Sequence, residues 1–214
     1  MPTLALGAVP GWLTRIMELR IDVDSGSWKL DNELESLYTR ITRPGDRLHD
    51  MPEVKTDIPG MVLHYREADG EFYVYVVDTV QRRLAGYTVF NRLVEVGRRA
   101  DSFLRAPHSK YDPQYQRRGL ANAVYRWALD AGQCLMTGAR QSAAARGLWQ
   151  SLAAHYPSGY VDVRRKVLTY LGPAVPDAVL HDLHTRMVLL GRGWTWPVLG
   201  QAMGLRGPAP CLLP

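Results

Sequence analysis

The spacing of apolar residues between positions 120 and 131 predicts an amphipathic helix. Leu120, Val124 and Ala128 recur every four residues and so share one helical face, while polar residues fall on the opposite face. Gly132 follows, and glycine commonly ends a helix. We therefore expect this helix to bury one face and expose the other.

Alternating apolar and polar positions predict strands upstream of this helix. They cover residues 61–67, 71–78 and 83–93, and Asp69-Gly70 has the composition of a hairpin turn between the first two. A further strand ends at Tyr111 and contains Pro107, which cannot donate a hydrogen bond to a neighbouring strand. We expect an edge, a bulge or a break in the sheet at this proline.

The remaining pattern adds helices and strands on both sides of this region. Expected helices cover residues 31–41, with Asp31 as the N-cap, a segment capped by Ser142, and residues 177–190. Residues 12–23 read as a strand or short helix, 42–60 as a loop, 133–137 as a strand, and 160–171 as a strand or bent hairpin. The succession of strand, helix, strand and helix predicts an α/β fold with a mixed sheet flanked by helices, in which a parallel pair of strands opens.

The residues before position 120 form a basic glycine turn. Gln116, Arg117, Arg118 and Gly119 lead directly into the predicted helix. A helix start offers unpaired backbone N–H groups and partial positive charge, and Gly119 allows a ligand to approach the backbone closely. Two arginines add forked donors, so the turn is typical of a phosphate site. The alternative is an ordinary solvated basic turn.

The segment Gln116-Arg117-Arg118-Gly119-Leu120-Ala121 resembles the Gln/Arg-x-x-Gly-x-Gly/Ala signature of the GCN5-related N-acetyltransferases, or GNAT family. The preceding Tyr111-Asp112-Pro113-Gln114-Tyr115 is similar to the family's approach to this turn. The resemblance implies a GNAT-like fold that binds acetyl-CoA and transfers its acetyl group to an amine. It also implies that a splayed strand receives the pantetheine arm, and that residues 42–60 shape the acceptor pocket.

The resemblance implies roles for individual residues. The turn from Gln116 to Ala121 would hold the pyrophosphate, and a backbone N–H among Ser109, Lys110 and Tyr111 would face the thioester carbonyl. In the second helix the family's Asn-x-x-Ala-x-x-Leu-Tyr pattern aligns with Ser142, Ala145, Leu148 and Trp149. Ser142 is therefore counted with the coenzyme site.

Acyl transfer also needs a base and, in many members of the family, an acid. His108 is the candidate base because its ordinary pKa near 6.5 suits proton uptake at neutral pH; a strand-packing histidine is the alternative. Asp101 and Glu95 are carboxylate alternatives. Trp149 replaces the family's acidic tyrosine and cannot release a proton. Tyr156 is the substitute candidate, although a tyrosine on an apolar helix face commonly packs in a core.

Composition and charge narrow the class of protein. The 214 residues suit a globular protein, which we divide into an acetyltransferase-like domain at 1–172 (core 61–172) and a C-terminal helix with a loosely ordered tail at 173–214. Residues 81–118 hold nine Lys and Arg against three Asp and Glu, which concentrates positive charge near the turn. Two cysteines without metal-ligand spacing, no long apolar run and no signal-like start favour a cytoplasmic protein without a metal or a membrane span.

Three further interpretations remain open from the sequence. A nucleic-acid-binding module would use the arginines and lysine at positions 82, 83, 98, 99, 117, 118 and 164–166 on one phosphate-tracking face. A catalytically degenerate fold would use Trp149 and the apolar tail for protein contacts, and that tail could also serve a homodimer. The serine and tryptophan variant of the second helix resembles a phage-type branch of the family.

Overall fold

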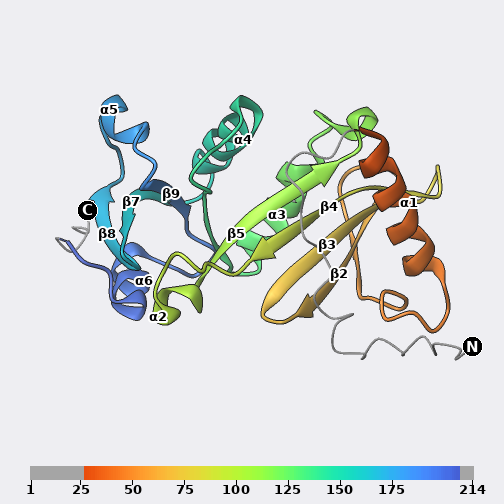
Figure 1. Cartoon of the computed structure of the whole chain (residues 1–214), viewed down its shortest axis with the longest axis horizontal. Coiled ribbons are helices and arrows are strands. Elements are labelled where there is room, and N and C mark those ends of the chain that lie inside the picture. The colour runs from red at the N-terminus through yellow and green to blue at the C-terminus, as the bar shows by residue number, and fades with distance from the viewer. Residues whose placement is uncertain (1–26, 208–214) are drawn as a thin grey trace, which may run out of the picture.

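A computed structural model describes residues 27–207. A mixed nine-stranded sheet crosses this part of the chain in the order β1-β2-β3-β4-β5-β6-β9-β7-β8, with helices on both faces (Figure 1). This is the α/β architecture predicted from the sequence. The expected element at 12–23 lies outside the described residues.

The bounds of the elements follow the chain. The strands are β1 (Glu53–Lys55), β2 (Met61–Ala68), β3 (Glu71–Asp78), β4 (Arg83–Asn91), β5 (Leu104–Tyr111), β6 (Cys134–Met136), β7 (Ser158–Arg164), β8 (Val167–Gly172) and β9 (Thr185–Leu189). The helices are α1 (Ser27–Thr42), α2 (Arg98–Asp101), α3 (Leu120–Asp130), α4 (Ala143–Ala153), α5 (Asp177–Leu180) and α6 (Trp196–Met203), with a 3₁₀ turn, η2, at Pro113–Tyr115.

The sheet has one parallel pair, and it is short. β5 and β6 pair only at Leu104↔Cys134 and Arg105↔Leu135, whereas the other neighbouring strands run antiparallel. β5 then continues for six more residues alongside β4 alone. Figure 1 shows the two parts of the sheet diverging from this point, with α2 and α6 at the joined end. The predicted opening of a parallel pair is therefore confirmed.

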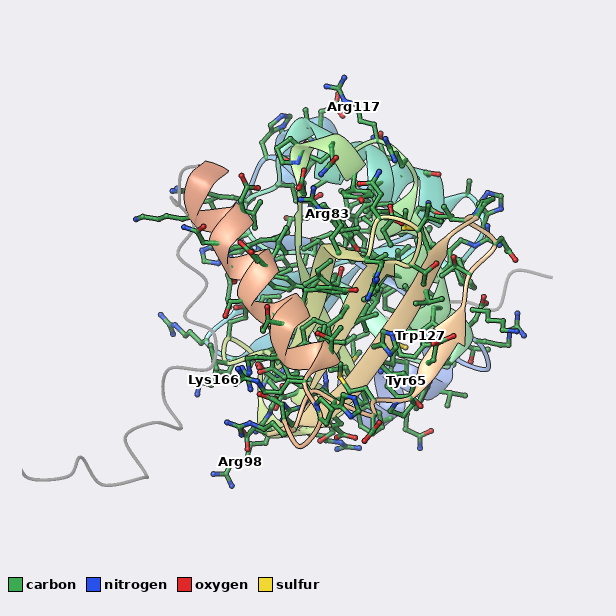
Figure 2. The ribbon with its side chains drawn as sticks, turned by 90° about the vertical axis from the view of Figure 1, so that its right-hand side faces the viewer. Tyr65, Arg83, Arg98, Arg117, Trp127 and Lys166 are labelled. Carbon is green, nitrogen blue, oxygen red and sulfur yellow. The ribbon has the colours of Figure 1, made fainter. Side chains whose placement is uncertain are left out.

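Three hydrophobic clusters hold the helices to the sheet. The cluster under α3 and α4 contains Val124, Leu129 and Leu152, and α1 covers a second cluster on the opposite face of β3 and β4. A third lies between β6, β7 and β9 and helices α2 and α6. At the edge of the first cluster, Trp127 of α3 packs on Tyr65 of β2 with 5.1 Å between ring centroids (Figure 2).

Most of the predicted elements are confirmed. Asp69 and Gly70 adopt φ values of 55° and 77°, as a tight hairpin turn requires. The helix expected from residue 120 is α3, and Ser142 caps α4 by accepting a hydrogen bond from the Ala145 N–H. Residues 160–171 form most of the β7–β8 hairpin rather than a single strand. Among residues 27–207, no helix is both long and apolar enough to cross a bilayer.

Four local predictions are wrong. α1 begins at Ser27, so Asp31 lies inside the helix and does not cap it. The expected loop at 42–60 contains β1, which extends the sheet beyond β2. The expected helix at 177–190 is one helical turn followed by β9, because residues 185–189 pair with both β6 and β7. Residues 196–203 form α6, whose Leu199 and Met203 are buried, so this part of the tail is ordered against the core.

The position of β9 also bears on the domain boundary that we placed after residue 172. β9 lies between β6 and β7 and hydrogen-bonds to both strands. A boundary at 172 therefore divides one continuous sheet.

Candidate active site

The turn between β5 and α3 is held by side chains from β3 and β4. Asp112 accepts hydrogen bonds from the Gln114 backbone and lies 2.6 Å from the Arg83 guanidinium. Tyr115 is 1% exposed, and its hydroxyl donates to Asp78 at 2.8 Å. These contacts fix the turn without using the backbone N–H groups that follow it.

The start of α3 is open to a ligand. Gly119, the N-cap residue, has φ of 79°, and Arg117 has φ of 61°. In the part of the chain that the structure describes, no side chain caps the first turn of the helix, so the N–H groups of Leu120 and Ala121 remain available. A Cβ atom added to Gly119 would meet nothing within 4 Å, which leaves space in front of these groups. The arrangement suits an anion, as the sequence predicted.

The predicted phosphate-binding side chains differ in their availability. Arg117 is exposed and projects into solvent at the end of the molecule (Figure 2). Arg118 is also exposed, and its guanidinium lies 5.3 Å from the centre of the Tyr115 ring. Gln116 uses its side-chain amide to donate to the Tyr111 carbonyl at 3.0 Å. Gln116 therefore shapes the turn, and the arginines are the side chains free to meet an anion.

Within residues 27–207, no strand pairs with β5 beyond Arg105 on the side that faces β6. The Asp112 N–H donates to Ala85 of β4, and alternate residues of an antiparallel strand donate to the same neighbour. Lys110 and His108 therefore also direct their N–H groups to β4, whereas Ser109 and Tyr111 direct theirs to the open side. Pro107 has no N–H group and lies on this open side too, which explains why pairing with β6 stops just before it. The edge expected at Pro107 is thus found on one side of β5.

A hydrogen-bonded group of side chains lines the α3 face of this edge. Ser109 Oγ lies 2.8 Å from the Thr88 hydroxyl and donates to the Tyr125 hydroxyl at 3.3 Å. Tyr111 also bonds to Thr88, at 3.2 Å. Burial raises the pKa of Tyr125 to about 12, so its phenol stays protonated at neutral pH.

Trp149 of α4 packs against the Tyr125 side chain of this hydrogen-bonded group. It is 4% exposed and meets the Tyr125 ring edge-on, with centroids 6.1 Å apart. It also lines a cavity of about 230 Å³ between α4, β9 and α5. Trp149 thus contacts both this cavity and the ring of Tyr125.

His108 lies on the other face of β5, toward α1. Its Nε2 atom is buried without a hydrogen-bond partner in the described residues. On the same face, Glu33 of α1 lies 3.2 Å from the Lys110 ammonium and accepts a 2.6 Å hydrogen bond from Tyr87. Burial, helped by the charge of Lys110, lowers the pKa of His108 below 6.5, and Glu33 opposes the shift. His108 is therefore neutral at pH 7 and able to accept a proton.

The structure does not bring the other predicted acid and base candidates to this edge. The Tyr156 hydroxyl donates to Asp130 at the C-terminal end of α3, about 16 Å along the helix from Gly119. Asp101 accepts from the Leu93 N–H and from Arg92; burial pushes the Asp101 pKa up, but these bonds outweigh it and leave the pKa lowered. Glu95 lies 3.9 Å from Arg186 of β9.

Sequence reasoning did not identify several residues of this site. Glu33 stands on the polar face of a correctly predicted helix, but its contact with Lys110 joins positions 77 residues apart. Thr88 and Tyr125 looked like ordinary strand and helix residues. Their roles arise because both reach Ser109 from neighbouring elements, which no local pattern records.

The cationic residues of the nucleic-acid interpretation do not share one face. Arg117 lies at one end of the molecule, and Arg98 and Lys166 lie at the other (Figure 2). Arg83 is paired with Asp112, Arg164 with Asp162 and Asp182, and Arg99 donates to carbonyls at the end of α6. These contacts leave two separate groups of free cations instead of a continuous track.

Comparison with known proteins gives only remote similarities. No family model matches the chain, and no curated protein matches it. Among solved structures, a chimera of the spermidine N-acetyltransferase SpeG from Vibrio cholerae and hSSAT aligns at 15% identity and a TM-score of 0.35, covering 84% of this chain and 87% of the other. A ribosomal-protein-S5-alanine acetyltransferase from Vibrio fischeri aligns at 12% identity and the same TM-score, covering 77% and 91%. These likenesses are too remote to assign a role to any residue of this chain, and the phage-type branch finds no support.

Proposed function

We propose that the protein is an acetyl-CoA-dependent N-acyltransferase that moves an acetyl group to an amine acceptor by direct attack. One observation carries the proposal: only the turn of residues 112–119 separates the open edge of β5 from the uncapped start of α3. Free amide donors on the strand and an anion site at the helix therefore lie on either side of this turn. A long ligand with a phosphate group and a polar carbonyl fits such a pair of sites.

The residues present fit acetyl-CoA. The N–H groups at the start of α3, with Arg117 and Arg118, would hold its pyrophosphate, and the space at Gly119 admits the phosphates to the backbone. When bound, acetyl-CoA supplies an activated acyl group and a thiol leaving group of pKa about 8.5. The N–H groups of Ser109 and Tyr111 face the open side, where they can donate to a carbonyl oxygen.

His108 supplies the base in this proposal. Among the described residues, the His108 Nε2 atom is buried and has no hydrogen-bond partner. It lies on the α1 face of β5, whereas the side chains of Ser109 and Tyr111 lie on the opposite face. An amine approaching from the α1 face would give its proton to His108, while the amide donors act at the edge of the strand. Transfer without a dedicated side-chain acid agrees with Trp149 at the position of the family's tyrosine. Homodimer formation and a cytoplasmic location remain predictions from the sequence.

Calorimetric titration with coenzyme A and acetyl-CoA tests the proposal. We expect both to bind the wild-type protein and to raise its melting temperature. Gly119→Val should abolish binding, because the side chain would occupy the space in front of the helix start. Gly45→Val is the matched control, since Gly45 has φ of 83° and also has nothing within 4 Å. Equal binding by the Gly119 variant would refute the phosphate assignment.

A further inference from the structure

The cavity of about 230 Å³ that Trp149 lines lies between α4, α5 and the face of β9 that carries Thr185 and Met187. Figure 1 shows α4 and α5 on either side of β9. The volume is below the roughly 300–1,000 Å³ of pockets that enclose drug-sized ligands, so the cavity suits a small molecule. The residues that we assign to acetyl-CoA and to the base do not line it, and it is therefore separate from the proposed active site.

The floor of this cavity is apolar and aromatic. Tyr160 of β7 and Met187 of β9 are paired in the strand register, and both side chains are half-buried. Trp149 of α4, which is 4% exposed, adds its indole to this floor. Such a surface packs against the carbon atoms of a ligand and leaves its orientation to the polar groups around it.

The wall formed by α4 carries a hydrogen-bond donor with a positive charge. Arg146 lines the cavity one helical turn before Trp149 and Gln150. Its side chain is exposed and has no hydrogen bond or ion pair within residues 27–207, and α4 itself contains no acidic residue. A guanidinium can only donate, and its parallel N–H groups match the two oxygens of a carboxylate.

The wall formed by α5 carries acceptors. The Asp177 carboxylate lines the cavity, is exposed, and is unpaired in the described part of the chain. His181 also lines it, and its Nδ1 atom lies 2.6 Å from the Asp177 carbonyl oxygen. A carbonyl oxygen can only accept, so Nδ1 carries a proton and the Nε2 atom of the neutral ring is an acceptor. This wall therefore suits a group that donates, such as an ammonium.

The two walls have opposite charges that do not neutralise each other. Arg146 and Asp177 line one cavity, yet they form no ion pair with each other or with any other residue of 27–207. A ligand with a single charge would be attracted to one wall and repelled by the other. A ligand with a positive charge at one end and a negative charge at the other meets attraction at both walls.

We propose that this cavity binds a small zwitterion, with its carboxylate at Arg146, its ammonium at Asp177 and its carbon chain on the floor beside Trp149. The ligand class is an amino acid whose two charged groups are separated by a short carbon chain. This inference goes beyond the acyltransferase proposal and does not depend on it, because the site is complete without acetyl-CoA.

Titration with molecules that share a chain length and differ in charge tests the proposal. We would titrate the protein, without acetyl-CoA, with ω-amino acids from glycine to 6-aminohexanoate, and with the carboxylic acid and the amine of each chain length. The zwitterion whose length fits the cavity should bind at least about 10-fold tighter than the acid or amine of that length, as expected for a charge-assisted bond at each end. Equal affinities within every set, or no binding of any zwitterion, would overturn the inference.

Two exposed substitutions assign the charges. In Arg146→Gln the zwitterion should bind no tighter than the amine, and in Asp177→Asn no tighter than the acid. Arg140→Gln is the matched control, because Arg140 is an exposed arginine on the loop before α4 that does not line the cavity. Its affinity for the zwitterion should equal that of the wild type. A preference for the zwitterion that survives both Arg146→Gln and Asp177→Asn would refute the site.

The fluorescence of Trp149 locates the ligand independently of its charge. A zwitterion on the cavity floor should change the intrinsic tryptophan fluorescence of the wild-type protein, and Trp149→Phe should remove this change. Trp194→Phe is the control, because Trp194 lines a different cavity, beside α3. It should retain the change. A fluorescence change that persists in Trp149→Phe and disappears in Trp194→Phe would place the ligand elsewhere and overturn the assignment to this cavity.

Discussion

The Tyr115 hydroxyl donates a 2.8 Å hydrogen bond to Asp78 and thereby ties the turn before α3 to the end of β3. Burial, together with the hydrogen bond to Asp78, raises the pKa of Tyr115 to about 12. The guanidinium groups of Arg83 and Arg118 also lie 5.8 Å and 5.3 Å from the centre of the Tyr115 ring. One buried side chain thus holds both the turn and an arginine that is free to meet a phosphate.

We therefore expect Tyr115→Phe to weaken coenzyme A binding several-fold. The variant keeps the ring but leaves Asp78 without this donor, which should lower the free energy of unfolding by about 1–3 kcal/mol. Tyr73→Phe is the control, since it removes a hydroxyl that donates to Glu71 on the same strand, away from the turn. Titration calorimetry and thermal melting measure both effects. An unchanged dissociation constant in Tyr115→Phe would show that the turn keeps its shape without Asp78.

The lowered pKa of His108 predicts a pH profile for acetyl transfer. A base acts in its neutral form, so kcat/KM should fall as pH drops through the His108 pKa, with a midpoint below 6.5. Lys110→Met removes a positive neighbour and leaves Glu33 uncompensated, and both changes raise the His108 pKa. The acidic limb should then move to higher pH. Lys55→Met, on exposed β1, should leave the limb in place, and a limb unaffected by Lys110→Met would exclude His108 as the base.

Substitutions of Trp149 test whether its side chain only packs against Tyr125 or takes part in catalysis. Trp149→Phe retains an aromatic ring against Tyr125, so turnover should stay within about threefold. Trp149→Tyr should raise turnover, because a phenol can release a proton and an indole cannot. Steady-state rates with coenzyme affinity measured in parallel decide the matter. A loss of about 100-fold in the Phe variant with intact binding would identify the indole N–H as a catalytic donor.

The hydroxyl of Tyr156 should be dispensable for catalysis. Its partner Asp130 lies at the opposite end of α3 from Gly119, and Asp130 also pairs with Arg192 at 3.1 Å. We expect Tyr156→Phe to keep kcat within about twofold and to change only stability slightly. A pronounced fall in kcat, with normal melting behaviour, would restore Tyr156 as the acid.

The separation of the basic residues predicts weak binding to nucleic acid. Arg98 and Lys166 lie together at the end of the molecule away from Arg117 (Figure 2). A double change of both to Ser should leave acetyl-CoA affinity unaltered. We would measure binding to transfer RNA or duplex DNA by fluorescence anisotropy across a salt series. The slope of log affinity against log salt concentration should correspond to no more than about two phosphate contacts. A steep slope that the double change abolishes would instead favour nucleic acid as the ligand.

Local sequence patterns were sufficient to predict those elements whose conformation depends on residues close together in the sequence. The αL turn at Asp69-Gly70, the periodic apolar face of α3 and the Ser142 cap each depend on residues close in sequence, and each was predicted correctly. β9 was mistaken for a helix because residues 177–190 contain apolar residues at mixed spacings. Its conformation is determined by the two strands on either side of it, which lie about 30 and 50 residues away in the chain.

Part of the candidate site could likewise be predicted from local sequence, and part could not. The turn from Gln116 to Ala121 was found from the sequence because its backbone groups act locally. The partners of Lys110 and Ser109 on β5 come from distant parts of the chain: Glu33 from α1 and Thr88 from β4.

The place of β9 in the sheet has a consequence for how the protein is made. The β7–β8 hairpin bonds to the rest of the sheet through β9, and β9 pairs with β6, about 50 residues earlier in the chain. During synthesis the two parts of the sheet therefore cannot join until residues 185–189 have been made. Contacts that connect such distant residues form slowly, because a long loop has to close first. The strand order β6-β9-β7 is consequently completed only after β9 has emerged.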